Sequence, residues 1–181
     1  MSMYQSLIEF WFSDEVSERW FKSTPDFDRQ LYERYSETWR AAKQRELDQW
    51  CDTATGSLAM VILLDQFPLN MFRGSAKSFA TEAQSRDVAR AAIDHGFDRE
   101  LTAAQKSFLY MPFMHSENLH DQALSLRLFD QGGLEDNLRF ARHHYGIVER
   151  FGRFPHRNKI LGRESTDAEI EYLNSKQGFK G

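Results

Sequence analysis

The chain contains 181 residues, with 23 Lys and Arg against 27 Asp and Glu, a formal net charge of −4 and a pI near 5.9. This balance excludes a protein that is basic throughout and coats nucleic acid or an anionic membrane. The single cysteine, Cys51, excludes an intramolecular disulfide framework and a zinc site built from several cysteines. Its apolar surroundings after Trp50 favour a structural role over a nucleophilic one.

The length predicts one soluble domain over residues 1–181, since domains commonly hold roughly 100–200 residues. No apolar run approaches the roughly 20 residues of a membrane span, and the first residues lack the layout of a signal peptide. We therefore expect a cytoplasmic location without membrane association. The tail from about residue 177 is expected to fray.

The first half of the chain shows three helical patterns. Residues 26–50 lack Gly and Pro and repeat apolar side chains at helical spacing. Residues 57–67 are almost wholly apolar, and the proline that follows favours a buried helix that stops there. Residues 75–95 are rich in alanine and end at a His-Gly pair that is typical of a helix C-terminus.

The second half continues with helices. Thr102 is expected to cap a short helix that runs to residue 112, and Ser116 or Asn118 to cap a helix over residues 117–130. A further helix is predicted over residues 134–152. Thr166 and Glu169 form a capping box that begins a last helix, ending near residue 176. Because sustained period-two alternation is missing, we expect an all-α fold with little or no sheet.

The four prolines lie at positions 25, 68, 112 and 155, at separations of 43, 44 and 43. The residue four positions before each proline is apolar, so each proline is predicted to end a helix and to close one helical hairpin. A period in the low forties falls within the range of helix-pair solenoids. Coincidence among four residues is the alternative.

The basic side chains gather in one stretch. Between residues 139 and 163 there are seven Arg and Lys against one acid, a net charge of +6, so the rest of the chain carries −10. Within it, five residues with spacings of 4, 3, 4 and 3 share one helix face: Arg139, His143, Gly146, Arg150 and Arg153. This face predicts an anion-binding surface on which Gly146 leaves room for a ligand. The alternative is a structural network that pairs these arginines with acids elsewhere.

Other polar side chains lie in apolar surroundings. His144 shares a helix face with Phe140, Ile147 and Phe151, so it is either a hydrogen-bonded core residue or a base or ligand anchor. Asp65 ends an apolar helix, and a buried carboxylate needs a cation or several donors, which the Arg- and His-rich stretch could supply.

The segment around residue 115 places a histidine and a carboxylate at the start of a predicted helix. His115 and Glu117 lie there, with Gln122 one turn further on. A carboxylate at this end is favoured by the helix dipole. The spacing does not match that of a metal-binding pair of histidines on one helix face, so no metal is predicted.

Three motifs together indicate a known family. The segments LLDQFPLNMFRGSAKSFA, YMPFMHSENLHDQ and RFGRFPHRNKILGRESTDAE are similar to those of the domain-of-unknown-function 924 family, which is mostly bacterial. The resemblance covers nearly the whole chain and implies an all-helical fold, a helical-hairpin array in a tetratricopeptide-like right-handed superhelix. It implies no established activity. The matching positions are Asp65, Gln66, Phe67, Pro68, Asn70, Arg73, Gly74, His115, Ser116, Glu117, Gln122, His144 and 150–163. Leu69 departs from the family pattern, which usually has Arg there.

The leading hypothesis is a helical binding module whose polar pocket takes a small anionic molecule or an acidic peptide, with no cofactor. The candidate binding residues are Asp65, Gln66, Asn70, Arg73, His115, Glu117, Gln122, His144, Arg150, Arg153, His156, Arg157, Asn158 and Arg163.

Three alternatives remain open. An enzyme of hydrolase or transferase type would use His144 or His115 with Asp65 or Glu117, and needs an imidazole near a carboxylate in an open pocket. RNA binding through the basic stretch is the least favoured, because the rest of the chain is acidic. A purely structural polar network with no ligand is the third. The sequence does not indicate an oligomeric state.

Overall fold

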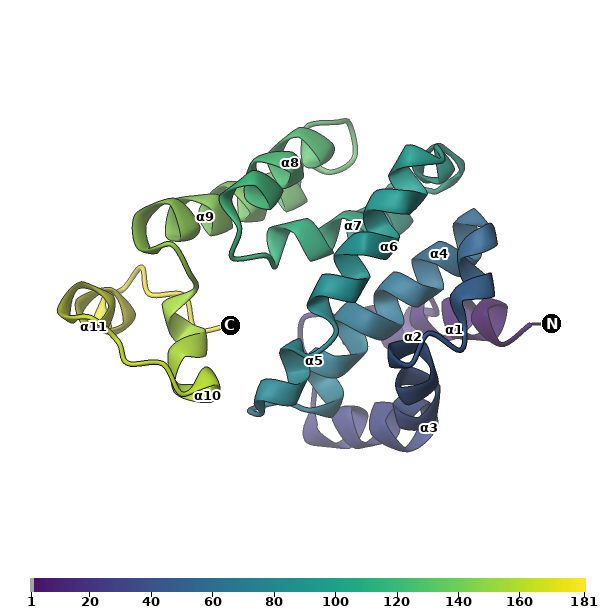
Figure 1. The fold of residues 1–181 in the computed structure, drawn as a ribbon, viewed down its shortest axis with the longest axis horizontal. Coiled ribbons are helices and arrows are strands. Elements are labelled where there is room, and N and C mark those ends of the chain that lie inside the picture. Colours follow the sequence, from purple (N-terminus) through teal and green to yellow (C-terminus); the bar gives the residue numbers. More distant parts are fainter. Residues whose placement is uncertain (1) are drawn as a thin grey trace. The chain divides into compact units, whose positions relative to one another are not determined.

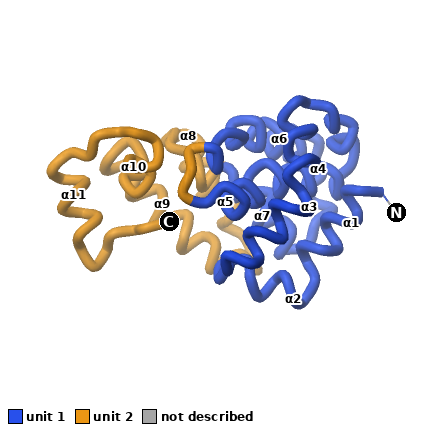
Figure 2. Tube along the Cα trace, turned by 90° about the horizontal axis from the view of Figure 1, so that it is seen from below, with its two compact units in different colours: residues 1–73, 77–112 blue, residues 74–76, 113–181 orange. Residues whose placement is uncertain are grey.

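A computed structural model describes residues 2–181 (Figure 1). Within this range every regular element is a helix and no strand is present, so the all-α prediction is confirmed. The chain divides into two compact units, coloured separately in Figure 2. Unit 1 comprises residues 1–73 and 77–112, and unit 2 comprises residues 74–76 and 113–181.

Unit 1 is built around the apolar helix α4, against which α1 and α6 pack. The side chains of Leu58 and Val61 in α4 are fully buried, as are those of Leu7 from α1 and Ala89 from α6. Most helices of this unit are short. The helices that lie wholly or mostly in unit 1 are α1 Met3–Trp11, α2 Asp14–Ser17, α3 Pro25–Lys43, η1 Asp48–Asp52, α4 Ala54–Val61, η2 Ile62–Gln66, α5 Phe67–Met71, η3 Ala76–Phe79, α6 Glu82–Asp94, η4 Phe97–Glu100 and α7 Ala103–Met114.

The helix predicted over residues 26–50 ends earlier than expected. Thr24 caps α3 by accepting a hydrogen bond from the Phe27 backbone N–H at 3.3 Å, and Pro25 occupies the first turn. The helix ends at Lys43, because Arg45 adopts a left-handed backbone with φ of 63°. A separate 3-10 helix, η1, then covers Asp48–Asp52.

Unit 2 is built around two packed helices, α8 and α9, which lie side by side in Figure 1. Asn118 caps α8, and Thr166 with Glu169 forms the predicted capping box of α11. The bounds are α8 Leu119–Phe129, α9 Glu135–Phe151, η5 Pro155–Arg157, α10 Asn158–Leu161 and α11 Asp167–Asn174.

The core of unit 2 lies where α9 meets the residues that follow it. Ile147 and Phe154 are buried there together with Tyr172 from α11. Phe179, in the tail predicted to fray, packs against this core. The end of α9 and the last turn of α11 are therefore held by a shared apolar cluster.

The prediction that each proline ends a helix is wrong. Pro25 and Pro155 begin helices, because a missing N–H costs nothing at a first turn. Pro112 lies inside α7, which continues to Met114. Pro68 also lies within a continuous helical run, from α4 through η2 into α5.

The helical run continues through Pro68 because the turn before the proline has a different helical geometry. A proline cannot donate to the carbonyl four residues earlier, and its ring clashes with that carbonyl. Here η2 is a π-helical turn, a wider turn that commonly accommodates such an interruption. The Leu64 carbonyl accepts a hydrogen bond from the Thr81 hydroxyl at 2.6 Å instead, and Thr81 in turn accepts one from the Trp39 indole at 3.1 Å.

Replacing Thr81 with Val should destabilise the protein by about 1–3 kcal/mol, because the buried Leu64 carbonyl and the Trp39 indole would both lose a partner. Thr81→Ser, which keeps the hydroxyl, is the matched control and should lose less. Urea unfolding measures both. Equal losses in the two variants would contradict this role of the hydroxyl.

Candidate functional site

The candidate residues of the first motif all belong to unit 1. Asp65 and Gln66 lie in the π-helical turn η2, and their side chains are buried. The Gln66 amide donates a hydrogen bond to the Asp65 carboxylate at 2.6 Å. The expected pairing of Asp65 with the Arg- and His-rich stretch stays a prediction.

Asn70 and Arg73 converge on a carboxylate that the sequence analysis did not single out. Asn70 donates to Asp28 Oδ1 at 2.8 Å, and Arg73 Nε donates to Asp28 Oδ2 at 2.7 Å. Burial raises the pKa of Asp28, but the hydrogen bonds from Arg73, Ser23 and Asn70 outweigh it and hold the pKa below its usual value. These contacts join α5 to the start of α3, so Asn70 and Arg73 have a structural use here.

Unit 2 contains the remaining candidates, and Arg153 is firmly paired there. Its guanidinium makes two parallel hydrogen bonds to Glu169, at 2.7 and 2.8 Å, and a third to the Glu164 carbonyl at 2.8 Å. The hydrogen bond from Arg153 is the main cause that lowers the pKa of Glu169 to about 2. Arg153 follows Gly152, whose left-handed backbone ends α9, so it is not part of the predicted helix face.

A second pair repeats this arrangement. Arg163 donates to both oxygens of Glu117, at 2.7 and 2.8 Å, and Glu117 also accepts from the Phe154 backbone N–H at 2.8 Å. Burial raises the pKa of Glu117, yet these hydrogen bonds hold it below its usual value.

The buried side chain of Asn158 joins the two pairs. Its Nδ2 donates to Glu169 Oε2 at 3.2 Å, and its Oδ1 accepts from Arg163 Nε at 2.9 Å. We call Arg153, Glu169, Asn158, Arg163 and Glu117 the Asn158 network. Its members satisfy one another, which is the arrangement that the structural alternative predicted.

Two further candidates donate hydrogen bonds to backbone carbonyls. Arg157 is 6% exposed, donates to the His115 carbonyl at 3.0 Å and lies over the Phe154 ring. Gln122 is fully buried and donates to the carbonyls of Met114 and Ser116, both at 2.7 Å. These contacts fix the turn that leads into α8.

The two imidazoles of His144 and His156 are held neutral. Burial lowers the pKa of His144 to about 3, although a hydrogen bond of 2.8 Å with the Phe140 carbonyl opposes this. Burial and the nearby Arg157 lower the pKa of His156 to about 4. A side chain with a pKa near 3 is a poor general base at neutral pH. The hydrogen bond of His144 goes to a backbone carbonyl, so the enzyme alternative that uses His144 is not favoured.

An open groove lies beside the exposed face of α9. Its volume is about 640 Å³. Gly146 lies in it, and a Cβ added there would meet nothing within 4 Å, so this glycine does leave space beside the helix. Of the predicted face, His143 and Arg150 also line the groove, whereas Arg139 pairs with Asp136 at 3.2 Å. The groove is lined by Arg142, His143, Gly146, Ile147, Arg150, Phe151, Tyr172, Lys176 and Gln177.

Two cations of this groove, Arg142 and Lys176, are not among the candidate residues predicted from the sequence. Arg142 lies one turn before Gly146, at a spacing of four that could have been recognised. Lys176 follows α11 and belongs to no motif. Of the fourteen candidates from the sequence, the groove includes Arg150.

The described residues meet neither the requirements of a metal site nor those of a membrane-spanning helix. Among residues 2–181, no group of three His, Cys, Asp or Glu side chains is placed to hold a metal ion. Over the same residues, no helix is both long enough and apolar enough to cross a lipid bilayer.

The depressed pKa values of His144 and His156 predict a loss of stability in mild acid. Above pH 6.5 both imidazoles are neutral in the folded and in the unfolded protein. Below pH 6.5 they become protonated in the unfolded protein, whereas in the folded protein they stay neutral until the pH approaches their lowered pKa values. Each of the two histidines should then lower the free energy of unfolding by about 1.4 kcal/mol for each unit by which the pH falls. Urea unfolding between pH 7.5 and 5.0 measures this slope. His144→Gln should roughly halve it, and an unchanged slope would contradict the assignment.

Two of the comparisons with known proteins found a match. The family model described as bacterial protein of unknown function (DUF924) matches residues 7–177. The solved structure of a protein of unknown function, ATU0120 from Agrobacterium tumefaciens, is similar with a TM-score of 0.90 and 41% sequence identity, over 95% of this chain and 97% of that one. No curated protein matches. The helices, the motifs and this match together place the chain in the DUF924 family.

Proposed function

We propose that the protein is a small-anion binding module and that the anion binds in the groove beside α9. The observation that carries this proposal is the charge of the groove. Three cationic side chains, Arg142, Arg150 and Lys176, line it, and none of its described lining residues is acidic. All three are exposed, so a ligand can reach them from solvent.

The placement of the two arginines suits a compact anion. Arg142 and Arg150 lie one turn before and one turn after Gly146, so their side chains border the space that the glycine leaves. The Arg150 guanidinium lies 4.7 Å from the Phe151 ring centre and 6.0 Å from that of Tyr172. Such stacking keeps a guanidinium oriented, and its planar donors match phosphate and carboxylate oxygens.

The ligand class follows from this chemistry. A small phosphorylated or carboxylated metabolite, or an acidic peptide segment, would supply the oxygens that these donors need. In this proposal the Asn158 network supports the groove rather than binding the anion. Its arginines already have carboxylate partners, which an incoming anion would have to displace.

The proposal also covers the finer architecture and the cellular location. We propose that the chain is a single domain, that its helices form a tetratricopeptide-like right-handed superhelix, and that the protein is cytoplasmic. The packing of α8 against α9, which are joined by a short connection, supports the helical-hairpin part of this assignment.

A side chain that occupies the groove should prevent anion binding without destabilising the fold. Gly146→Leu places a side chain in the open space beside α9 and removes a helical glycine, so it should raise stability by about 0.5–1 kcal/mol. The same variant should lose the stabilisation given by anions. A thermal-shift panel of inorganic phosphate and phosphorylated or carboxylated metabolites measures both effects.

Two arginines on α9 give a matched comparison. Arg150→Ala should weaken anion binding by about tenfold, the effect of losing one charge-assisted contact. Arg139→Ala removes the same charge from the same helix outside the groove and should leave binding nearly unchanged. The proposal fails if no anion of the panel stabilises the protein, or if both variants respond alike.

A further inference from the structure

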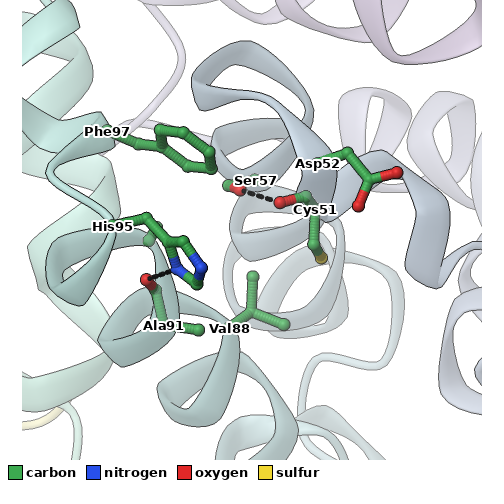
Figure 3. A pocket seen from close by; sticks show the side chains of 8 residues that line it. Cys51, Asp52, Ser57, Val88, Ala91, His95 and Phe97 are labelled. Carbon is green, nitrogen blue, oxygen red and sulfur yellow. Dashed lines mark hydrogen bonds between the residues drawn. The ribbon is translucent and has the colours of Figure 1, made fainter.

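Unit 1 contains a second cavity that the proposed function does not use. It lies between the segment around η1 and the start of α4 on one side and the end of α6 with η4 on the other (Figure 3). Its volume is about 310 Å³. It is lined by Cys51, Asp52, Ser57, Val88, Ala91, Ala92, His95 and Phe97.

Most of the wall is apolar and suits a ring-sized group. Val88, Ala91 and Ala92 present one face of α6, and Phe97 lies beyond the helix end, stacked at 5.5 Å on the His95 ring. The volume is about twice the roughly 150 Å³ of an apolar cavity that takes benzene. A molecule with one ring and a short chain therefore fits.

The polar groups of the cavity accept hydrogen bonds more than they donate them. His95 Nδ1 lies 2.7 Å from the Ala91 carbonyl, which holds the proton on that nitrogen and leaves Nε2 as an acceptor. The Ser57 hydroxyl donates to the Cys51 carbonyl at 3.3 Å. Figure 3 shows both contacts at the edge of the pocket.

The local charge is negative. Burial, Asp48 and Asp52 raise the pKa of the Cys51 thiol to about 11, so the thiol is mostly protonated at neutral pH and reacts slowly. Arg45 lies 3.7 Å from Asp48. Among the described residues no cation lies within ion-pair distance of Asp52, which is exposed and is one of the residues that line the cavity.

We propose that this cavity binds a small organic amine, with its ammonium group at Asp52 and its ring against Val88 and Phe97. An ammonium group complements the charge of the Asp52 carboxylate. An organic acid of the same shape would place its carboxylate beside that of Asp52, and the two negative charges would repel each other.

The single cysteine gives a direct test on the full chain. Phenethylamine should slow the reaction of Cys51 with 4,4′-dithiodipyridine in a saturable way, because both molecules need the same cavity. Amide chemical shifts of Ala91 and Ala92 should follow the same titration. The matched control ligand is 3-phenylpropionate, which has the same ring and chain length with a carboxylate, and it should bind more weakly.

Two variants sharpen the result. Asp52→Asn, at an exposed position, should weaken phenethylamine binding by about threefold to fivefold and leave the fold intact. Val88→Trp should abolish binding by filling the cavity. The proposal is overturned if phenethylamine neither protects Cys51 nor shifts these amides, or if 3-phenylpropionate binds equally well.

Discussion

The side-chain amide of Asn158 holds two arginine–glutamate pairs at once, and the architecture of unit 2 depends on it. Glu169 lies on α11, whereas Glu117 lies just before α8, so one buried side chain links segments far apart in the sequence. A buried amide of this kind is stable only when its donors and acceptor all find partners. The network therefore fixes where α11 lies against the end of α9.

The groove beside α9 depends on that placement. One of its walls is α9 and the other is formed by Tyr172 and Lys176, on and just after α11. The same capping box that begins α11 uses Glu169, which accepts from Thr166 at 2.8 Å while it binds Arg153. A motif that resembles a binding site in the sequence thus has its side chains paired with one another and helps to position the groove beside α9.

Arginine appears in two environments in this unit, and the environment decides its role. Arg153 and Arg163 are about a quarter exposed, and each makes two parallel hydrogen bonds to a carboxylate. Removing a partner from such a pair leaves a charge that is costly to bury. Arg142 and Arg150 are exposed and border open space, and within residues 2–181 neither has a carboxylate at ion-pair distance that an anion would have to displace.

Local signals in the sequence predicted the local features well. The caps at Asn118 and Thr166 depend on residues within one turn, and both were recognised. The continuation of the helix past Pro68 was missed, because the Thr81 hydroxyl that satisfies Leu64 comes from 17 residues further along. Likewise, the basic stretch was visible in the sequence, but the choice between ligand and carboxylate as its partner depends on tertiary pairing.

The most direct test of this account is a phosphate titration followed by amide chemical shifts. The account predicts saturable shifts centred on residues 142–150 and Lys176, with little change at Glu117, Asn158 and Arg163. Shifts centred instead on Glu117, Asn158 and Arg163 would contradict it. Such a result would show that the Asn158 network opens to bind the anion itself.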